Sequence, residues 1–311
     1  MQPSQHLRDK LRSTLINDLF NRIRWGKQRV MRRSDGERIL LDRYIRVYGK
    51  VPNLNSPKSF SEKLLCRMLS LNRNPSLNYV ADKFAARTYA ARRVGEQHLV
   101  KLLWHGHDPG KIPFESLPEE YVIKTNHAYN QVIVVKDNPN RTDIINKISV
   151  WLKVNYYWSN REGQYYHIEP RIMIEEYLKN QDGSGPLDYK FWCFNGKPEV
   201  VHVDNFARSI NPFFDMQWNL LDLHYREGAS RPAIGRPKHF EEMLFVVSQL
   251  SANFDFVRVD LYNIDGQIYF GECTLTPTAG ESIFRPAKWD LILGEKWQMR
   301  SIELLALHAL L

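Results

Sequence analysis

Two carboxylates near the end of the sequence lie where a β-hairpin would place them side by side. Asp260 belongs to an alternating apolar run, and Glu272 follows on the far side of the tight turn Asp265–Gly266. Antiparallel pairing around that turn brings both side chains to one face, and Thr274, two residues beyond Glu272, points the same way. Oxygen ligands of this kind suit Mg²⁺, whose shell nucleotide phosphates can complete. We predict a metal site at Asp260, Glu272 and Thr274. Solvated edge carboxylates are the alternative, which the apolar neighbours of both acids disfavour.

The elements that must hold these residues are hairpins alternating with helices. Alternating apolar runs with turns between them predict hairpins over residues 121–135, 188–203 and 256–272. Helical spacing predicts helices over residues 59–71, 79–93, 143–155 and 240–250. Ser59 and Glu62 have the spacing of a capping box at the start of the first helix. Mostly antiparallel hairpins between helices predict an α+β fold with two lobes.

The overall composition is that of a globular chain large enough for two lobes. The 311 residues are 43% hydrophobic and 25% charged. No apolar run approaches the ~20 residues that a membrane span needs, and no apolar core follows the basic N-terminus as in a secretory signal. Cys66, Cys193 and Cys273 are far apart and form no metal-ligand spacing or disulfide framework. We therefore expect a cytoplasmic protein with reduced thiols.

The N-terminal segment, residues 1–50, is predicted to be helical and carries the net positive charge of the chain. It holds 13 Lys and Arg against 5 Asp and Glu, which matches the total of +8, so residues 51–311 are neutral overall. Nucleic-acid binding needs a basic stripe on the folded body, so we expect no nucleic acid partner. Apolar and basic residues interleave over residues 1–33, which suits peripheral contact with an anionic membrane. A helix packed on the body with a solvated basic face explains the pattern equally well.

Several motifs together resemble those of the ATP-grasp superfamily, and of its teichuronopeptide-biosynthesis (TupA-like) branch in particular. The pattern Arg258-x-Asp260, Glu272-x-Thr274 and Pro277 is similar to the metal-binding end of ATP-grasp ligases such as D-alanine–D-alanine ligase. The motifs of the narrower branch span residues 50–290 and include SPKSFSEKL, DKFAAR, LPEEYVIKTNH, REGQYYHIEPRIMIEEYL, DYKFWCFNGKPE and FGECTLTP. The resemblance implies a two-lobed ATP-grasp fold over residues 51–311 that binds ATP and Mg²⁺. Its N-lobe and central lobe would cover residues 51–174, and its C-lobe residues 175–311.

The resemblance also implies a nucleotide site. Lys83 and Lys124 would hold the ATP phosphates, a task that suits a flexible point charge. The polar loop containing His127 would close over the phosphates, although it lacks the glycine-rich run usual in the superfamily. The hinge between the lobes, which would contact the adenine and the ribose, would consist of Glu175, Glu176, Tyr177 and Leu178. Judged by sequence context alone, the lysines can be solvated surface residues and the two glutamates can simply end a strand.

Four further residues are implied around the reacting centre. Asp188 would lie in the nucleotide site, with Lys190 beside the phosphate or acyl phosphate. Arg208 and Arg258 would stabilise charge that develops during the reaction. Asp188 and Lys190 share one strand face, so a purely structural pair is the alternative for them.

The reaction implied by the resemblance joins a carboxylate to an amine through an acyl phosphate. For the TupA-like branch, it implies an amino acid or peptide attached to a uronic-acid-containing cell-surface polysaccharide or its precursor. The enzyme would then work in the cytoplasm, at the inner face of the membrane. A glycosyltransferase of polysaccharide biosynthesis is one alternative, although no Asp-x-Asp metal motif is evident. A non-catalytic scaffold at the membrane surface is the other.

Overall fold

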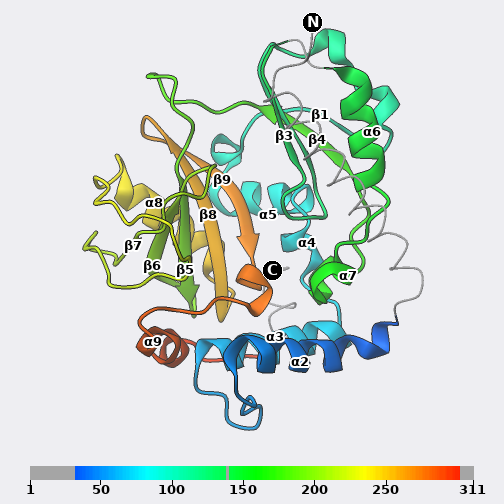
Figure 1. The fold of residues 1–311 in the computed structure, drawn as a ribbon. Coiled ribbons are helices and arrows are strands. Elements are labelled where there is room, and N and C mark those ends of the chain that lie inside the picture. The colour runs from blue at the N-terminus through cyan, green and yellow to red at the C-terminus, as the bar shows by residue number, and fades with distance from the viewer. Residues whose placement is uncertain (1–31, 138–139, 302–311) are drawn as a thin grey trace, which may run out of the picture.

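A computed structural model describes residues 32–137 and 140–301, which form two antiparallel sheets with helices around them (Figure 1). The four-stranded sheet has the order β1-β4-β2-β3 and consists of Leu102–Gly106 (β1), Ile172–Glu176 (β4), Tyr121–Thr125 (β2) and Val132–Val135 (β3). The five-stranded sheet has the order β7-β6-β5-β8-β9 and consists of Phe213–Phe214 (β7), Lys197–Asp204 (β6), Asp188–Phe194 (β5), Phe256–Ile264 (β8) and Gln267–Thr274 (β9). The three predicted hairpins are β2–β3, β5–β6 and β8–β9, so the α+β fold class is confirmed.

The helices divide into long elements that cover the sheets and short turns that connect them. The longer helices are Gly36–Tyr48 (α2), Phe60–Arg73 (α3), Ala85–Val94 (α5), Arg141–Trp151 (α6), Phe240–Ser251 (α8) and Lys288–Lys296 (α9). The one-turn helices are Asn78–Ala81 (α4) and Tyr157–Asn160 (α7). The 3₁₀ turns are Arg33–Asp35 (η1), Glu96–His98 (η2), Pro109–Lys111 (η3), Phe114–Ser116 (η4), Gly163–Tyr165 (η5) and Pro277–Gly280 (η6). Helix α3 begins with the predicted capping box of Ser59 and Glu62.

In each sheet a helix packs against an apolar face. On the four-stranded sheet, α6 packs Ile144, Ile148 and Trp151 against Ile123 and Ile174. On the five-stranded sheet, α8 packs against a large apolar cluster that includes Phe191, Val201, Val257, Val259 and Leu261. Because successive side chains on a strand point to opposite faces, the residues between these apolar ones point away from α6 and α8.

Helices α2, α3 and α9 lie along one end of the molecule (Figure 1). Phe60 of α3 sits in an aromatic cluster with Trp192 and Phe256 of the large sheet and with Trp297 after α9. Leu40 and Tyr44 of α2 join α3 in a smaller cluster. The predicted membrane-contacting segment, residues 1–33, lies almost entirely outside the described residues, and the division of the chain at residue 50 stays a prediction. Across residues 32–137 and 140–301, no helix has the length and apolar character needed to cross a membrane.

Candidate active site

One face of the five-stranded sheet carries the predicted metal ligands and several of the other residues predicted for the site. Cross-strand pairing sets His202 (β6), Lys190 (β5), Asp260 (β8) and Glu272 (β9) in one row. The next row along the strands consists of Trp192, Arg258 and Thr274. The apolar cluster beneath α8 lies on the opposite face, while the rows beyond Arg258 continue into the aromatic cluster around Phe60. We call this surface the polar face.

Arg258 draws the three predicted metal ligands together. Its Nη2 lies 2.6 Å from Asp260 Oδ2, 3.0 Å from Thr274 Oγ1 and 3.3 Å from Glu272 Oε1. Its Nε also donates to Asp260 Oδ1 at 2.7 Å. The predicted neighbourhood of Asp260 and Glu272 is therefore present, and three oxygens from three side chains converge on one positive group.

The three oxygens around Arg258 are of the kind that Mg²⁺ prefers as ligands in proteins. They also lie close together, because all three contact the same guanidinium group. Two of them are carboxylates and one is a hydroxyl. Over the described part of the chain, no group of three or more His, Cys, Asp or Glu side chains is arranged to hold a metal ion. A magnesium ion here would consequently need oxygens from outside the protein, such as nucleotide phosphates, to complete its shell.

Glu272 is held in its charged form by the cations around it. Lys83 Nζ lies 3.5 Å from its Oε2, while Arg258 contacts the other carboxylate oxygen, Oε1. Burial by itself would raise the pKa of Glu272, but Lys83 and Arg258 lower it to about 2. The side chain is thus an ionised carboxylate at neutral pH.

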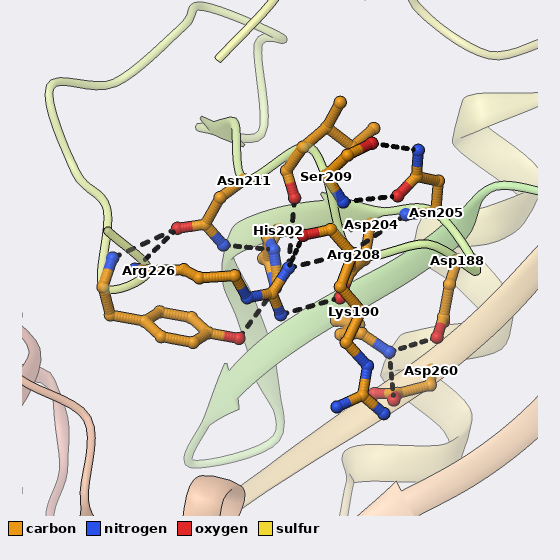
Figure 2. Close-up of polar contacts among 12 residues, drawn as sticks. Asp188, Lys190, His202, Asp204, Asn205, Arg208, Ser209, Asn211, Arg226 and Asp260 are labelled. Carbon is orange, nitrogen blue, oxygen red and sulfur yellow. Dashed lines mark hydrogen bonds and ion pairs between the residues drawn. The ribbon is translucent and has the colours of Figure 1, made fainter. Parts of the chain in front are cut away.

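Lys190 lies between two carboxylates on the polar face (Figure 2). It pairs with Asp188, two residues earlier on β5, and its Nζ lies 3.1 Å from Asp260 Oδ2. Burial opposes its charge, but Asp188 and Asp260 outweigh burial and raise the pKa of Lys190. Burial also raises the pKa of Asp188 to about 6. The structural pair of Asp188 and Lys190 is therefore present, and the contact with Asp260 ties it to the predicted metal ligands.

Lys83 reaches this cluster from a break between two helices. The sequence predicts one helix over residues 79–93, and this is wrong because the chain leaves the helical path between α4 and α5. In the gap, Lys83 N donates to Asn126 O (3.0 Å), and Asn126 Nδ2 donates to Asp82 Oδ1 (2.9 Å). These bonds to a distant loop replace bonds within a helix. They leave the Lys83 ammonium donating to Ala128 O at 2.9 Å, beside the polar face.

Glu175 is held at the end of β4 by two cations. Lys124 Nζ lies 2.6 Å from its Oε2, and Arg87 Nη1 lies 3.0 Å from its Oε1. Glu175 is only 5% exposed, so it is not the solvated strand end that its sequence context allows. Arg87, on α5, is missed by the sequence analysis, since an arginine in an alanine-rich helix carries no local sign of such a role.

The residues after Glu175 connect the two sheets. Glu176 ends β4, and the chain then passes through Tyr177 and Leu178 on its way to β5 in the other sheet. Glu176 is exposed, and Lys136 Nζ lies 4.6 Å from the centre of the Tyr177 ring. The predicted hinge segment therefore does link the sheets, while its contacts with a nucleotide stay a prediction.

Two predicted residues lie apart from the cluster on the polar face. The ring of His127 is buried, with Nε2 3.1 Å from Val154 O, and burial lowers its pKa to about 4. His127 is thus neutral and its Nε2 faces the segment after α6, while its contact with a phosphate stays a prediction. Arg208 is exposed at the rim, in the segment between β6 and β7, where its guanidinium lies over Tyr129.

A buried carboxylate missed by the sequence analysis lies close to the predicted metal ligands. Glu162 accepts a hydrogen bond from the Thr276 hydroxyl at 2.5 Å, two residues beyond Thr274, and it is 5% exposed. The following residue, Gly163, lies so close to α3 that a Cβ would be 1.9 Å from Leu71 O. Burial raises the pKa of Glu162 from 4.5 to about 7.

We expect Glu162→Gln to change the pH dependence of stability. Between about pH 4.5 and pH 7 the native state holds a proton that the unfolded state has lost, so wild-type stability falls as pH rises through this window. Glutamine does not ionise, so this decline should disappear. In thermal melts, the melting temperature of the variant relative to that of the wild type should be higher at about pH 8 than at about pH 5. The control is Glu169→Gln, whose side chain is 80% exposed. Parallel curves for wild type and Glu162→Gln would contradict the raised pKa.

Comparison with known families decides the class of the protein. The family described as TupA-like ATPgrasp matches residues 62–298 of the chain. The chain belongs to the TupA-like ATP-grasp family. This confirms the resemblance seen in the motifs.

Solved structures of D-alanine–D-alanine ligases and of an L-amino acid ligase are similar to the chain at low sequence identity. D-alanine–D-alanine ligase from Bacillus anthracis complexed with ATP is 15% identical, with a TM-score of 0.42, over 81% of this chain and 74% of that chain. The enzyme from Helicobacter pylori is 15% identical, with a TM-score of 0.40, over 74% of this chain and 58% of that chain. An L-amino acid ligase from Bacillus licheniformis is 16% identical, with a TM-score of 0.39, over 68% of this chain and 45% of that chain. The chain thus spans little more than half of the Helicobacter enzyme. No curated protein sequence matches the chain.

Proposed function

We propose that this TupA-like enzyme uses ATP to activate a carboxylate as an acyl phosphate and joins it to an amine. The observation that carries the proposal is the alternation of charge on the polar face. There the carboxylates of Asp188, Asp260 and Glu272 contact the cations Lys190, Arg258 and Lys83. Such a face presents preorganised positive groups to phosphate oxygens and preorganised oxygens to a metal ion.

Mg²⁺ would be held by Asp260, Glu272 and Thr274. When bound, it would neutralise and orient the phosphate groups of the nucleotide. Lys83 and Lys124 now neutralise Glu272 and Glu175 respectively, and both are flexible enough to turn toward phosphate oxygens. The proposed nucleotide site therefore lies between the polar face and the end of β4, with the hinge of residues 175–178 beside it.

The proposed reaction has two displacement steps. A substrate carboxylate oxygen attacks the γ-phosphorus of ATP, the bond from that phosphorus to its bridging oxygen breaks, and ADP leaves with the electron pair. The amine nitrogen then attacks the acyl carbon, the carbon–oxygen bond to phosphate breaks, and the nitrogen loses its proton to the departing phosphate or to solvent. Arg258 and Lys190 would bind the oxygens on which charge develops, and Arg208 would approach from the rim.

The finer proposal concerns the substrates. By its resemblance to the TupA-like branch, we propose an amino acid or short peptide as one substrate and a uronic-acid-containing glycan, or its precursor, as the other. The concentration of basic residues in the N-terminal segment supports peripheral contact with the inner face of an anionic membrane, where a lipid-linked precursor would be found.

Hydroxylamine trapping tests the proposed chemistry. The purified chain is incubated with Mg-ATP, hydroxylamine and a panel of amino acids and uronic acids. We expect release of ADP together with a hydroxamate of one panel member, and loss of both when EDTA is added. The hydroxamate would identify the activated carboxylate. Release of AMP would overturn the acyl-phosphate mechanism, and absence of any nucleotide turnover across the panel would overturn the ligase proposal.

A further inference from the structure

The segment between β6 and β7, residues 205–212, carries Arg208 to the rim of the polar face. In Figure 2 the Arg208 side chain points toward the side of the sheet that carries Lys190 and Asp260. Its guanidinium carbon lies 4.8 Å from the centre of the Tyr129 ring, which belongs to the loop after β2. Arg208 has a φ of 54°, a left-handed conformation that a residue with a side chain keeps only where its surroundings hold it.

Arg226 makes several of the contacts that keep the backbone of Arg208 in this conformation. Its Nη1 and Nη2 each lie 3.0 Å from one carboxylate oxygen of Asp204, in a two-pronged ion pair (Figure 2). Nη1 also donates to Arg208 O at 3.1 Å and to Ile210 O at 3.3 Å. Asp204 is the last residue of β6 and is 4% exposed, so the pair joins the exposed segment to the rigid sheet. Only a planar guanidinium can bind a carboxylate with two parallel bonds and reach two carbonyl oxygens as well.

A second contact fixes the far end of the segment. Asn211 Nδ2 donates to His202 Nε2 at 2.6 Å, and both residues are fully buried. Asn211 Oδ1 accepts from the backbone N–H groups of Tyr225 (3.1 Å) and Arg226 (3.3 Å). The segment is thus tied to β6 at both ends, while Arg208 between them stays exposed.

We propose that Arg226 is a positioning residue that acts through Arg208. It is anchored by Asp204 and holds the backbone of Arg208 and Ile210, so that the Arg208 guanidinium stands beside Tyr129 at the open side of the Lys190–Asp260 pair. This inference rests on the proposed function, because it assigns Arg226 to the placement of a group expected to meet charge on the transferring phosphoryl group. The chemical class of ligand that Arg208 meets is accordingly a phosphate or acyl phosphate.

A double-mutant cycle tests whether Arg226 acts through Arg208. Initial rates of ADP and hydroxamate formation are measured for wild type, Arg226→Lys, Arg208→Ala and the double variant, with kcat and KM for ATP determined separately. Lysine keeps the charge but cannot form the two-pronged pair. We expect Arg226→Lys to lower kcat about tenfold with little change in KM, and to have no further effect once Arg208 is alanine. Effects that multiply in the double variant would overturn the proposal.

Proteolysis gives a readout that needs no turnover. Trypsin cleaves after Arg208, and local opening controls the rate. We expect cleavage of the Arg208–Ser209 bond, followed by mass spectrometry, to be about tenfold faster in Arg226→Lys than in wild type. Arg285→Lys, in which the altered side chain pairs with exposed Glu227, is the matched control and should cleave at the wild-type rate. An unchanged rate in Arg226→Lys would overturn the proposal.

The double-mutant cycle and the proteolysis experiment together separate the failure of this proposal from the failure of the proposed function. If the wild type forms no hydroxamate, the ligase proposal fails, and the cleavage arm alone decides whether Arg226 holds the segment. If the wild type is active and the cycle is additive, the ligase proposal stands and the role of Arg226 fails. If Arg226→Lys does not fold, Asp204→Asn is used in its place in both experiments, because it weakens the same ion pair at the carboxylate.

Discussion

Replacing Glu272 with glutamine is expected to lower the rate of ADP and hydroxamate formation by about 10²–10³-fold. The amide has the same shape but no charge, so the predicted metal ligand is lost while the fold is kept. Lys83 and Arg258 would lose the carboxylate that both now contact, and the proposed Mg²⁺ site would retain one carboxylate in place of two. Initial rates at saturating Mg-ATP measure the effect.

The matched control for Glu272→Gln is Glu115→Gln, since Glu115 is 83% exposed and pairs with Arg141 away from the polar face. The control should keep wild-type activity. Thermal melts of both variants at neutral pH separate a catalytic effect from unfolding. A Glu272→Gln protein that is folded and fully active would remove Glu272 from the proposed site.

The second large effect is expected on stability, at the buried pair of Arg67 and Asp255. Both side chains are 1% exposed, and Arg67 Nη1 also donates to Phe256 O at 2.7 Å. The other carboxylate oxygen of Asp255 accepts from Arg300 N at 2.8 Å. Arg67→Met leaves Asp255 charged, buried and without its cation, which should lower the free energy of unfolding by about 3–5 kcal/mol. Urea unfolding followed by fluorescence measures this.

Two comparisons make the Arg67 result specific. Arg73→Met removes a similar pair with Glu37, but the Arg73 side chain is 67% exposed, so we expect a loss below about 1 kcal/mol. Arg67→Met combined with Asp255→Leu removes both charges and should recover much of the loss. A single Arg67→Met variant as stable as Arg73→Met would show that the pair does not join α3 to the large sheet in the way described.

Sequence reasoning succeeded where the deciding interactions are local. The β8–β9 hairpin is predicted by alternation and by the turn at Asp265–Gly266, which sets the register from Ile264 to Leu261. The turn alone would pair Asp260 with Gly271; a register shift between Asp260 and Leu261 pairs Asp260 with Glu272, and the sequence analysis did not foresee it. The capping box of Ser59 and Glu62 is likewise contained within one helical turn. The motif resemblance then indicated the family, which the match over residues 62–298 confirmed.

Only the tertiary structure decided the features that depend on partners distant in sequence. The helix predicted over residues 79–93 breaks because Lys83 and Asp82 bond to Asn126, a partner that propensity cannot foresee. The pairing of Arg87 with Glu175 and of Arg226 with Asp204 likewise joins residues 88 and 22 positions apart. Alternation with a period of two put Asp188 and Lys190 on one face of β5 and Arg258 and Asp260 on one face of β8. Which cations meet the carboxylates on the polar face depends on how the two sheets and their loops pack, and no short-range pattern records it.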